Sequence, residues 1–219
     1  MLDHCCKKAK SQNLHSLACG VTAGITLVLA ILSGYALSRF KICWNQWIVA
    51  AFLSAQMFPI VSRMISLYDL LGKVSLINTR TGLILALTAA MLPFTITLMA
   101  SFFDGIPREL EEAAIVDGAG RFQTLFLIVM PLVKAGMVAV GIYAFLMTWD
   151  DYLHAVTLIQ NDGLRTLSAG VALRYLGELS YDWSKVNTIS VVGILLIQFL
   201  FFFFQKHMVK GLVTGAVKG

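Results

Sequence analysis

Charged side chains are scarce in this sequence. They make up 13% of its 219 residues, whereas soluble domains carry roughly 25%. Hydrophobic residues make up 58%, which leaves too few polar side chains for an ordinary soluble domain. The net charge of +5 is not gathered into a basic patch with interleaved aromatic residues, which argues against a nucleic-acid partner. The composition instead predicts an all-α integral membrane protein surrounded by lipid.

Several kinds of chemical site are also missing. The four cysteines form no Cys-x-x-Cys pair and stand beside no histidine cluster, so we predict no metal site. The four histidines are scattered without a paired carboxylate, so we predict no catalytic residues and no enzyme. No Gly-x-x-x-x-Gly-Lys-Ser/Thr sequence occurs, because the tail "GLVTGAVKG" has the wrong spacing. The chain therefore has no predicted cofactor and no predicted ATP site of its own.

Long apolar runs dominate what is present. A helix of about 20 apolar residues crosses a bilayer. Five segments are long enough: Leu14–Leu37, Trp47–Leu71, Thr81–Phe103, Leu132–Ile159 and Val186–Phe204. A secretory signal is the alternative for the first segment, because "KKAK" precedes it, but the segment is longer than a signal core and no clear cleavage site follows. Gly20 and Gly24 within it have a spacing that lets two helices approach closely, although such pairs also occur by chance.

One charged stretch separates the third and fourth segments. Residues 104–121 carry seven charged side chains, which would cost on the order of 20 kcal/mol inside the hydrocarbon, so the stretch lies outside it. It is still built to be helical, because Pro107 suits a first helical position and glutamates follow near the positive end of the helix dipole. Gly118 permits a sharp bend, and a second helical piece runs from Arg121 toward Pro131. The sequence therefore predicts two helical arms joined by a bend at Gly118, one starting at Pro107 and one running from Arg121 toward Pro131; together they are called the elbow below.

The first arm of the elbow has a candidate docking face. Leu110, Ala113 and Ala114 lie at i, i+3 and i+4, so we expect them on one side of the helix. Small side chains on that side would let another protein approach closely. The alternative is a solvated loop whose charges only keep it out of lipid.

The elbow and its surroundings resemble a known family. The sequence "EAAIVDGAGRFQTLFLIVMP" resembles the EAA signature of permease subunits of binding-protein-dependent ABC importers, with Met130 where leucine is usual. The matching residues are Glu112, Ala113, Ala114, Gly118, Ile128 and Pro131. The stretches "SGYALSRF", "QMFP", "SFFDGIPRELEEAA", "TWDDYLHA" and "GLVTGAVKG" resemble the sugar-importer permeases related to the maltose system. The resemblance covers nearly the whole chain from about Ser16 onward.

The resemblance implies the fold and function of a type I ABC importer permease. Such a chain would carry sugars or oligosaccharides in an ATP-driven importer. Two permease subunits, expected to be a heterodimer, would form the pore, two cytoplasmic ATPase subunits would bind ATP, and an extracytoplasmic binding protein would deliver the solute. The elbow would be the coupling helix docked on an ATPase subunit. The alternative is an ion-coupled secondary transporter, which often shows internal repeats; none is seen here.

The resemblance also implies a multi-pass protein of the bacterial inner membrane, with the EAA loop and the C-terminus in the cytoplasm. Lysines and arginines divide eight against eight in this orientation, so the positive-inside rule does not decide it. Such permeases usually have six spanning helices, so the first is expected to be missing here. We divide the chain into an atypical N-terminal segment (1–13), a permease domain (14–206) and a cytoplasmic tail (207–219).

Charged residues within the predicted spans are candidates for the translocation path. Arg63 lies sixteen residues beyond Trp47 and Asp150 sixteen residues beyond Lys134, about 24 Å of helix from the cytoplasmic side in each case, so an intramembrane ion pair between them is one hypothesis. The other hypothesis places Arg63, Asp150 and Asp151 at the outer interface. Trp149 is expected either to stack on a sugar ring or to anchor at the interface.

Two prolines lie within the predicted spans. Pro59 and Pro93 are expected to interrupt the second and third segments, which frees backbone carbonyls that neighbours or a water-lined cavity must satisfy. Gln56 lies close to Pro59 and is a candidate for a polar path through the membrane.

Overall fold

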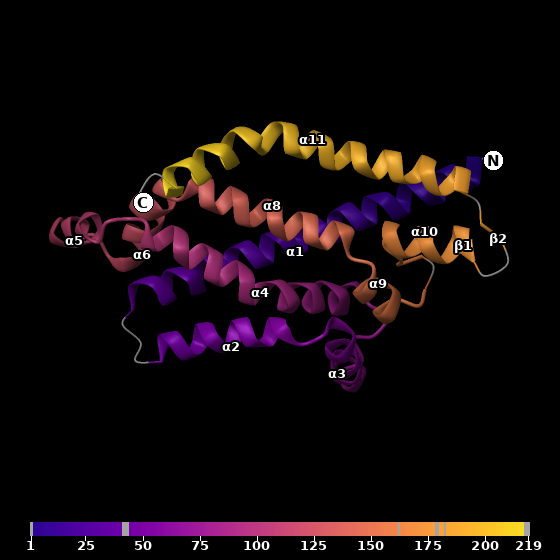
Figure 1. Cartoon of the computed structure of the whole chain (residues 1–219), viewed down its shortest axis with the longest axis horizontal. Helices are drawn as coiled ribbons and strands as arrows, with labels where there is room; N and C mark the ends of the chain where they lie inside the picture. Colours follow the sequence, from indigo (N-terminus) through magenta and orange to yellow (C-terminus); the bar gives the residue numbers. More distant parts are fainter. Residues whose placement is uncertain (1, 41–43, 162, 178–179, 182, 217–219) are drawn as a thin grey trace.

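The chain folds as a bundle of helices in the computed structural model, which describes residues 2–40, 44–161, 163–177, 180–181 and 183–216 (Figure 1). The longer helices are α1 (Leu2–Arg39), α2 (Asn45–Met57), α3 (Ile60–Lys73), α4 (Arg80–Asp104), α8 (Lys134–Asp150) and α11 (Trp183–Ala216). The shorter elements are α5 (Glu109–Val116), α6 (Arg121–Gln123), the π-helix η1 (Thr124–Val129), α7 (Met130–Leu132), α9 (Leu153–Leu158), α10 (Leu167–Tyr175), and the antiparallel strands β1 (Leu176–Gly177) and β2 (Ser180–Tyr181). Apart from this small hairpin the described chain is helical, which confirms the predicted all-α class.

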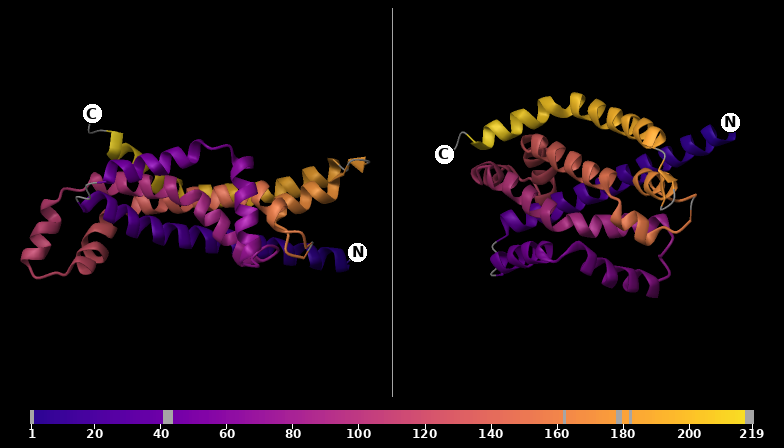
Figure 2. Two further views of the ribbon diagram at one scale, coloured as in Figure 1. Left: turned by 90° about the horizontal axis from the view of Figure 1, so that it is seen from below. Right: turned by 45° about the vertical axis from the view of Figure 1, so that its right-hand side comes forward.

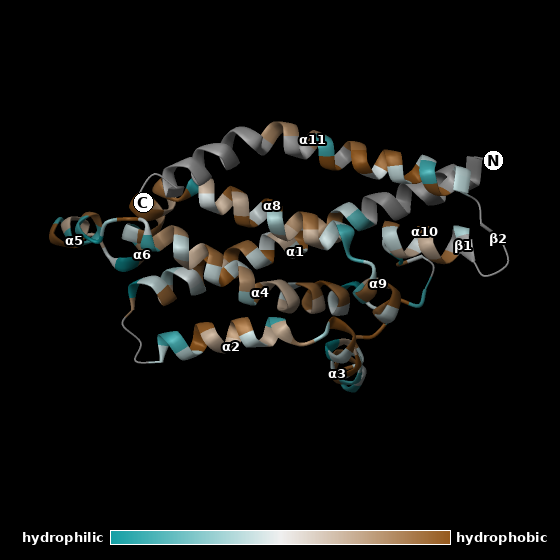
Figure 3. Ribbon diagram, in the orientation of Figure 1, coloured by the Kyte–Doolittle hydropathy of each residue, from teal (hydrophilic) through white to brown (hydrophobic). Residues whose placement is uncertain are grey.

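Most of the longer helices run lengthwise through the molecule. α1, α4, α8 and α11 run side by side along the molecule, and α2 packs along α4 (Figure 1). The elbow formed by α5 and α6 projects from one end of the bundle, here called the elbow end; α3, α9 and α10 lie at the opposite end, here called the far end (Figures 1 and 2). Hydropathy follows this division, because α4 and α8 are largely apolar while hydrophilic residues gather on α5 and α6 (Figure 3).

Two stretches are long and apolar enough to cross a membrane without a break. They are His15–Arg39 within α1 and Arg80–Asp104, which is α4, and they confirm the first and third predicted segments. Two bent pairs pass the same test together, α2 with α3 and Arg121–Leu132 with α8, so the described residues contain up to four spans. The fifth predicted segment lies within α11, which continues past both of its ends.

The second predicted segment, Trp47–Leu71, is not a straight span. α2 ends at Met57 and α3 begins at Ile60, and the two helices meet at 101°. Phe58 between them is extended, with ψ 134°, because a proline crowds the preceding residue out of the helical conformation. The interruption predicted at Pro59 is therefore confirmed. Its consequence is that α3 lies across the far end of the bundle instead of along it (Figure 1).

The fourth predicted segment, Leu132–Ile159, also breaks. The helical stretch before it and α8 meet at 81° near Val133. α8 then ends at Asp150, because Asp151 takes up an extended backbone with ψ 123°. The continuous part of this segment is therefore the 17 residues of α8.

Pro93 does not interrupt α4, contrary to the prediction. The helix runs through it without a break. The hydroxyl of Thr97 donates to the carbonyl of Pro93 at 3.1 Å, and the side-chain amide of Gln56 donates to the carbonyl of Ala90 at 3.4 Å. Both bonds lie within one turn of the proline, and the one from Gln56 ties α2 to α4 there.

A buried apolar cluster holds α1, α4, α8 and the second arm of the elbow together. Its fully buried members are Ala30, Met99, Phe103, Val129 and Val140. Gly34 lets α1 and α4 approach closely, because a Cβ atom there would lie 3.0 Å from the backbone nitrogen of Ala100. At Gly20 and Gly24 an added Cβ would meet no described atom within 4 Å. Among the described helices, the close contact of α1 is therefore at Gly34 and not at the predicted glycine pair.

Candidate coupling site

The elbow consists of two helical arms joined by a tight turn at Gly118, whose φ is +88°. The N–H of Gly118 donates to the carbonyl of Ile115 at 3.0 Å, and the N–H of Ala119 donates to that of Ala114 at 2.9 Å. This pair of bonds is typical of a helix that ends at a left-handed glycine, and it satisfies carbonyls left open at the helix end. The turn fixes the direction in which the chain leaves α5, so the predicted bend is present.

The second arm returns from the turn to the bundle as a distorted helix. Thr124–Val129 form a π-helix, in which the N–H of Met130 bonds to the carbonyl of Leu125, five residues earlier. Pro131 follows and has no N–H to donate, which disturbs the usual four-residue pattern. The predicted second helical piece is therefore present, but it is widened in its middle. Ile128 is half-buried there and Pro131 is exposed.

The outer surface of α5 is apolar and acidic. Val116 is 87% exposed, Ile115 54% and Leu110 45%, and Glu112 and Ala113 are exposed beside them. These five residues are called the outer face below. Large apolar side chains grouped on a projecting element are typical of a protein-interaction surface.

The predicted docking face of Leu110, Ala113 and Ala114 is not available as a whole. Leu110 and Ala113 are exposed, whereas Ala114 is only 5% exposed on an arm that packs against η1. A side chain as small as alanine suits the close packing of the two arms. Of the EAA triplet, Glu112 and Ala113 are therefore available to a partner, and Ala114 supports the elbow.

Glu111 lies on the inner side of α5 and is buried, with 8% of the residue exposed. Its carboxylate pairs with the guanidinium of Arg39 and accepts a hydrogen bond from the hydroxyl of Tyr35 at 2.8 Å. Both partners lie near the end of α1. These three residues are called the Glu111 cluster below. The sequence-based prediction missed it, although Glu111 precedes the buried Ala114 by three residues and so lies on the same side of the helix.

Arg63 and Asp150 do not form the predicted ion pair. No ion pair joins them within the described part of the chain, and the Nε atom of Arg63 is buried without a hydrogen-bond partner. The prediction placed Arg63 at the depth that a straight helix would give, whereas the 101° bend carries it on α3 across the far end. Asp150 is exposed at the last residue of α8. The outer-interface hypothesis for these charges stays a prediction.

Asp151 holds the break between α8 and α9. Its carboxylate accepts a hydrogen bond from the N–H of Ala155 at 3.2 Å and contacts Nδ1 of His154 at 2.6 Å. Its backbone carbonyl accepts a hydrogen bond from the hydroxyl of Ser168 at 2.6 Å, which ties the break to α10. The acidic side chain is therefore engaged within the chain, and it stabilises the start of α9.

Trp149 packs inside the bundle. The residue is 6% exposed, and its ring centroid lies 4.5 Å from that of His15 on α1 and 5.8 Å from that of Phe145. Both predicted uses, stacking on a sugar and anchoring at the interface, need an exposed ring. The structure instead assigns the ring to the contact between α1 and α8 at the far end.

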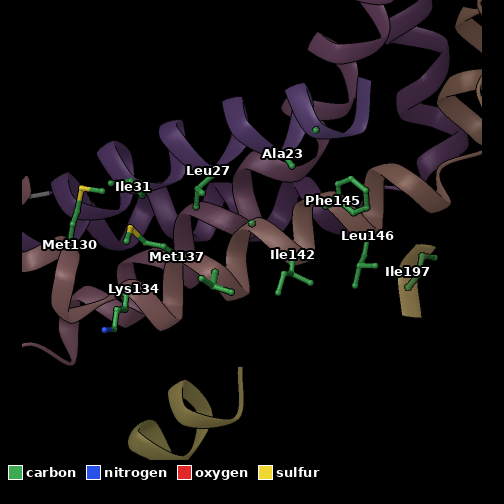
Figure 4. A pocket seen from close by; sticks show the side chains of 13 residues that line it. Ala23, Leu27, Ile31, Met130, Lys134, Met137, Ile142, Phe145, Leu146 and Ile197 are labelled. Carbon is green, nitrogen blue, oxygen red and sulfur yellow. The ribbon is translucent and has the colours of Figure 1, made fainter. Parts of the chain in front are cut away.

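An apolar cavity of about 620 Å³ lies between α1, α8 and α11 (Figure 4). Its lining includes Ala23, Leu27, Ile142, Leu146 and Ile197, and among the residues that the structure describes Lys134 is the one charged residue that borders it. The cavity is not lined by the residues predicted for the translocation path, which are Gln56, Arg63, Trp149, Asp150 and Asp151. Because a polar solute needs hydrogen-bond partners, this cavity is not suited to hold one.

Comparison with known proteins identifies the family. Residues 26–213 match the family described as "Binding-protein-dependent transport system inner membrane component". The chain is 36% identical over 199 residues to the sulfoquinovosyl glycerol transport system permease protein of Agrobacterium fabrum, covering 91% of this chain and 70% of that protein. It is 32% identical to the melibiose/raffinose/stachyose import permease protein of Bacillus subtilis, covering 91% of this chain and 72% of that protein.

Two solved structures have the same fold. A bacterial ABC transporter involved in the import of the acidic polysaccharide alginate gives a TM-score of 0.75 at 21% identity, over 90% of this chain and 74% of that chain. The MetNI methionine ABC transporter in an inward-facing conformation gives 0.72 at 16% identity, over 93% of this chain and 95% of that chain. The resemblance to the maltose-type sugar permeases is confirmed, and the alternative of a secondary transporter is not supported. The chain belongs to the family of binding-protein-dependent transport system inner membrane components: it is a multi-pass membrane permease with the fold of an ABC importer subunit.

Proposed function

We propose that this permease imports a sugar or an oligosaccharide, and that an ATPase subunit docks on the outer face of α5 and drives the transport. The observation that carries the proposal is the elbow itself. It projects from one end of the bundle, exposes apolar side chains beside Glu112, and is held by the hydrogen-bonded turn at Gly118. A rigid, exposed element of this kind suits the transfer of movement from a partner to the membrane helices.

The partners follow from what the chain is predicted to lack. Two ATPase subunits would bind ATP, because the sequence has no phosphate-binding loop. Their docking on α5 places the elbow, and with it the C-terminal tail, in the cytoplasm. A second permease subunit would complete the pore as a heterodimer, and an extracytoplasmic binding protein would deliver the solute to the far end.

The substrate class is supported by the relatives. The names of two of them specify a sulfoquinovosyl glycerol and the oligosaccharides melibiose, raffinose and stachyose. A third, the trehalose/maltose permease of Thermococcus litoralis, is 29% identical over 194 residues. We therefore propose a glycoside or short oligosaccharide as the solute of this permease.

Transport should require ATP on one side and a binding protein on the other. The permease would be reconstituted in proteoliposomes with its second permease and ATPase subunits, and uptake of labelled oligosaccharides would be measured. We expect uptake only with ATP on the ATPase side and binding protein on the opposite side, and we expect it to persist when ionophores collapse the ion gradients. Uptake that needs an ion gradient and no ATP would contradict the proposal.

The side on which the elbow lies is a separate prediction. With the four native cysteines replaced by serine, Val116→Cys in the elbow would be compared with Val74→Cys at the far end, since both valines are exposed. We expect a membrane-impermeant maleimide to label position 116 only in inside-out vesicles and position 74 only in right-side-out vesicles. ATPase subunits should protect position 116 and leave position 74 unchanged. Labelling of position 116 from the outside would contradict the proposed orientation.

A further inference from the structure

The Glu111 cluster joins two elements that are far apart in the sequence. Glu111 on α5 and its partner Arg39 on α1 are 72 residues apart, and Tyr35 binds the second carboxylate oxygen. The other acidic residues of α5, Glu109 and Glu112, are exposed. The elbow therefore has an inner side fixed to α1 and an outer face free for a partner.

Further polar contacts between the same two segments surround the cluster. Arg39 also donates to the carbonyl of Ile106 at 3.0 Å, in the turn that leads into α5. In the reverse direction, Arg108 donates to the carbonyl of Ser38 at 3.0 Å, and the hydroxyl of Ser38 bonds to Asp104. Together these bonds connect the last turn of α1 to the segment from Asp104 to Arg108 that leads into α5.

Burial makes this link stiff. The side chains of Arg39 and Glu111 are 8% and 11% exposed, so solvent screens their attraction weakly. When one partner of such a pair is removed, the other is left as an uncompensated buried charge, which is strongly unfavourable. The cluster therefore resists any movement of α5 that does not carry the end of α1 with it.

α1 is placed to carry such a movement through the bundle. One position before Tyr35, Gly34 packs against the backbone of Ala100, so α1 and α4 cannot slide freely past each other. At the far end, His15 on α1 contacts the ring of Trp149, next to the break at the end of α8. Twenty residues, about 30 Å of helix, separate His15 from Tyr35.

We propose that Glu111, Arg39 and Tyr35 are positioning residues that make α5 and α1 one rigid body, so that movement of the elbow reaches the far end of the bundle through α1. This inference rests on the proposed function, because it supposes that an ATPase moves the elbow. It assigns the buried inner side of the elbow a task distinct from docking. The outer face binds the ATPase subunit, and the Glu111 cluster makes α1 move together with α5.

The test is the number of solute molecules imported per ATP hydrolysed in proteoliposomes that contain the full complex. Glu111→Gln removes the buried charge with little change of shape, and Glu109→Gln makes the same chemical change at an exposed position of the same helix. We expect Glu111→Gln to lower the ratio at least roughly fivefold, the lower end of typical coupling between sites, while the ATPase subunits still copurify. Glu109→Gln should keep the ratio of the parent.

A milder variant keeps the test decisive if Glu111→Gln does not fold. Tyr35→Phe keeps the ring and its packing against Phe103, and it removes one hydrogen bond, so the ratio should fall by a smaller factor, roughly threefold. If Glu111→Gln does not assemble, the result for Tyr35→Phe decides. The proposal is overturned if every variant that assembles keeps the solute-to-ATP ratio of the parent. Failure of the proposed function is a different result, because the parent itself would then import solute without ATP.

Discussion

Replacing Gly118 by valine should lower uptake about tenfold while leaving membrane insertion intact. The φ of +88° at this position is one that a β-branched residue rarely adopts. A left-handed conformation costs an L-residue about 1–2 kcal/mol, and 1.4 kcal/mol is a factor of ten in the equilibrium constant between the native turn and its alternatives. No described atom lies within 4 Å of the added Cβ, so the effect is backbone strain and not a clash. Uptake and the amount of inserted permease would be measured together.

Gly120→Val is the matched control for this prediction. Gly120 lies two residues further along the same turn, but its φ is −71° and ψ 161°, an extended backbone that valine adopts readily. The nearest atom to an added Cβ is 3.7 Å away, on the side chain of Gln123. Uptake should therefore stay close to that of the parent. Equal losses in both variants would show that the loop tolerates no side chain at all, and would contradict an effect through φ at Gly118.

Replacing Gly34 by valine should destabilise the whole bundle. Its Cβ would lie 3.0 Å from both the backbone nitrogen of Ala100 and the Cβ of Met99, and backbone atoms in a packed helix yield little. Overpacking of this kind costs about 1–3 kcal/mol, which corresponds to a fall of roughly 2–12 °C in melting temperature for a chain of this size. The melting temperature of the detergent-solubilised complex would show it, together with a lower steady-state amount in the membrane.

Gly24→Val on the same helix is the control for that destabilisation. It introduces the same side chain ten residues earlier in α1, where nothing described lies within 4 Å of the new Cβ. We expect a change of no more than about 2 °C, because substitutions away from packed contacts are usually within 0.5 kcal/mol of neutral. If only Gly24→Val lowered the melting temperature, the contact assigned to Gly34 would be wrong.

Features that depend on neighbouring residues were predictable. The bend at Gly118 follows from a glycine just beyond a helical run, and the break before Pro59 follows from the steric demand of proline on Phe58. The charged elbow between two apolar segments follows from the cost of placing charge in hydrocarbon. Each of these is a property of a short stretch of chain.

Features that depend on how far the chain bends were not predictable. The hypothesis of an Arg63–Asp150 pair assumed a straight second helix, and one bend of 101° removed the equal depth on which it rested. The sequence also predicted a break at Pro93, but α4 continues through it where it packs beside α2, with the amide of Gln56 on α2 donating to the carbonyl of Ala90. In both cases the outcome was set by geometry beyond the local sequence.

Composition, motif and charge are properties of the residues alone, so the sequence was enough to predict a membrane protein, its family of importer permeases, and a charged elbow between two apolar segments. The packing of the helices sets which acidic residue of the elbow is buried, which glycine contacts α4, and that Trp149 is buried. Glu111 and Arg39 are 72 residues apart, and no local pattern records such a contact. Two helices must first pack side by side before a buried charge on one finds its partner on the other.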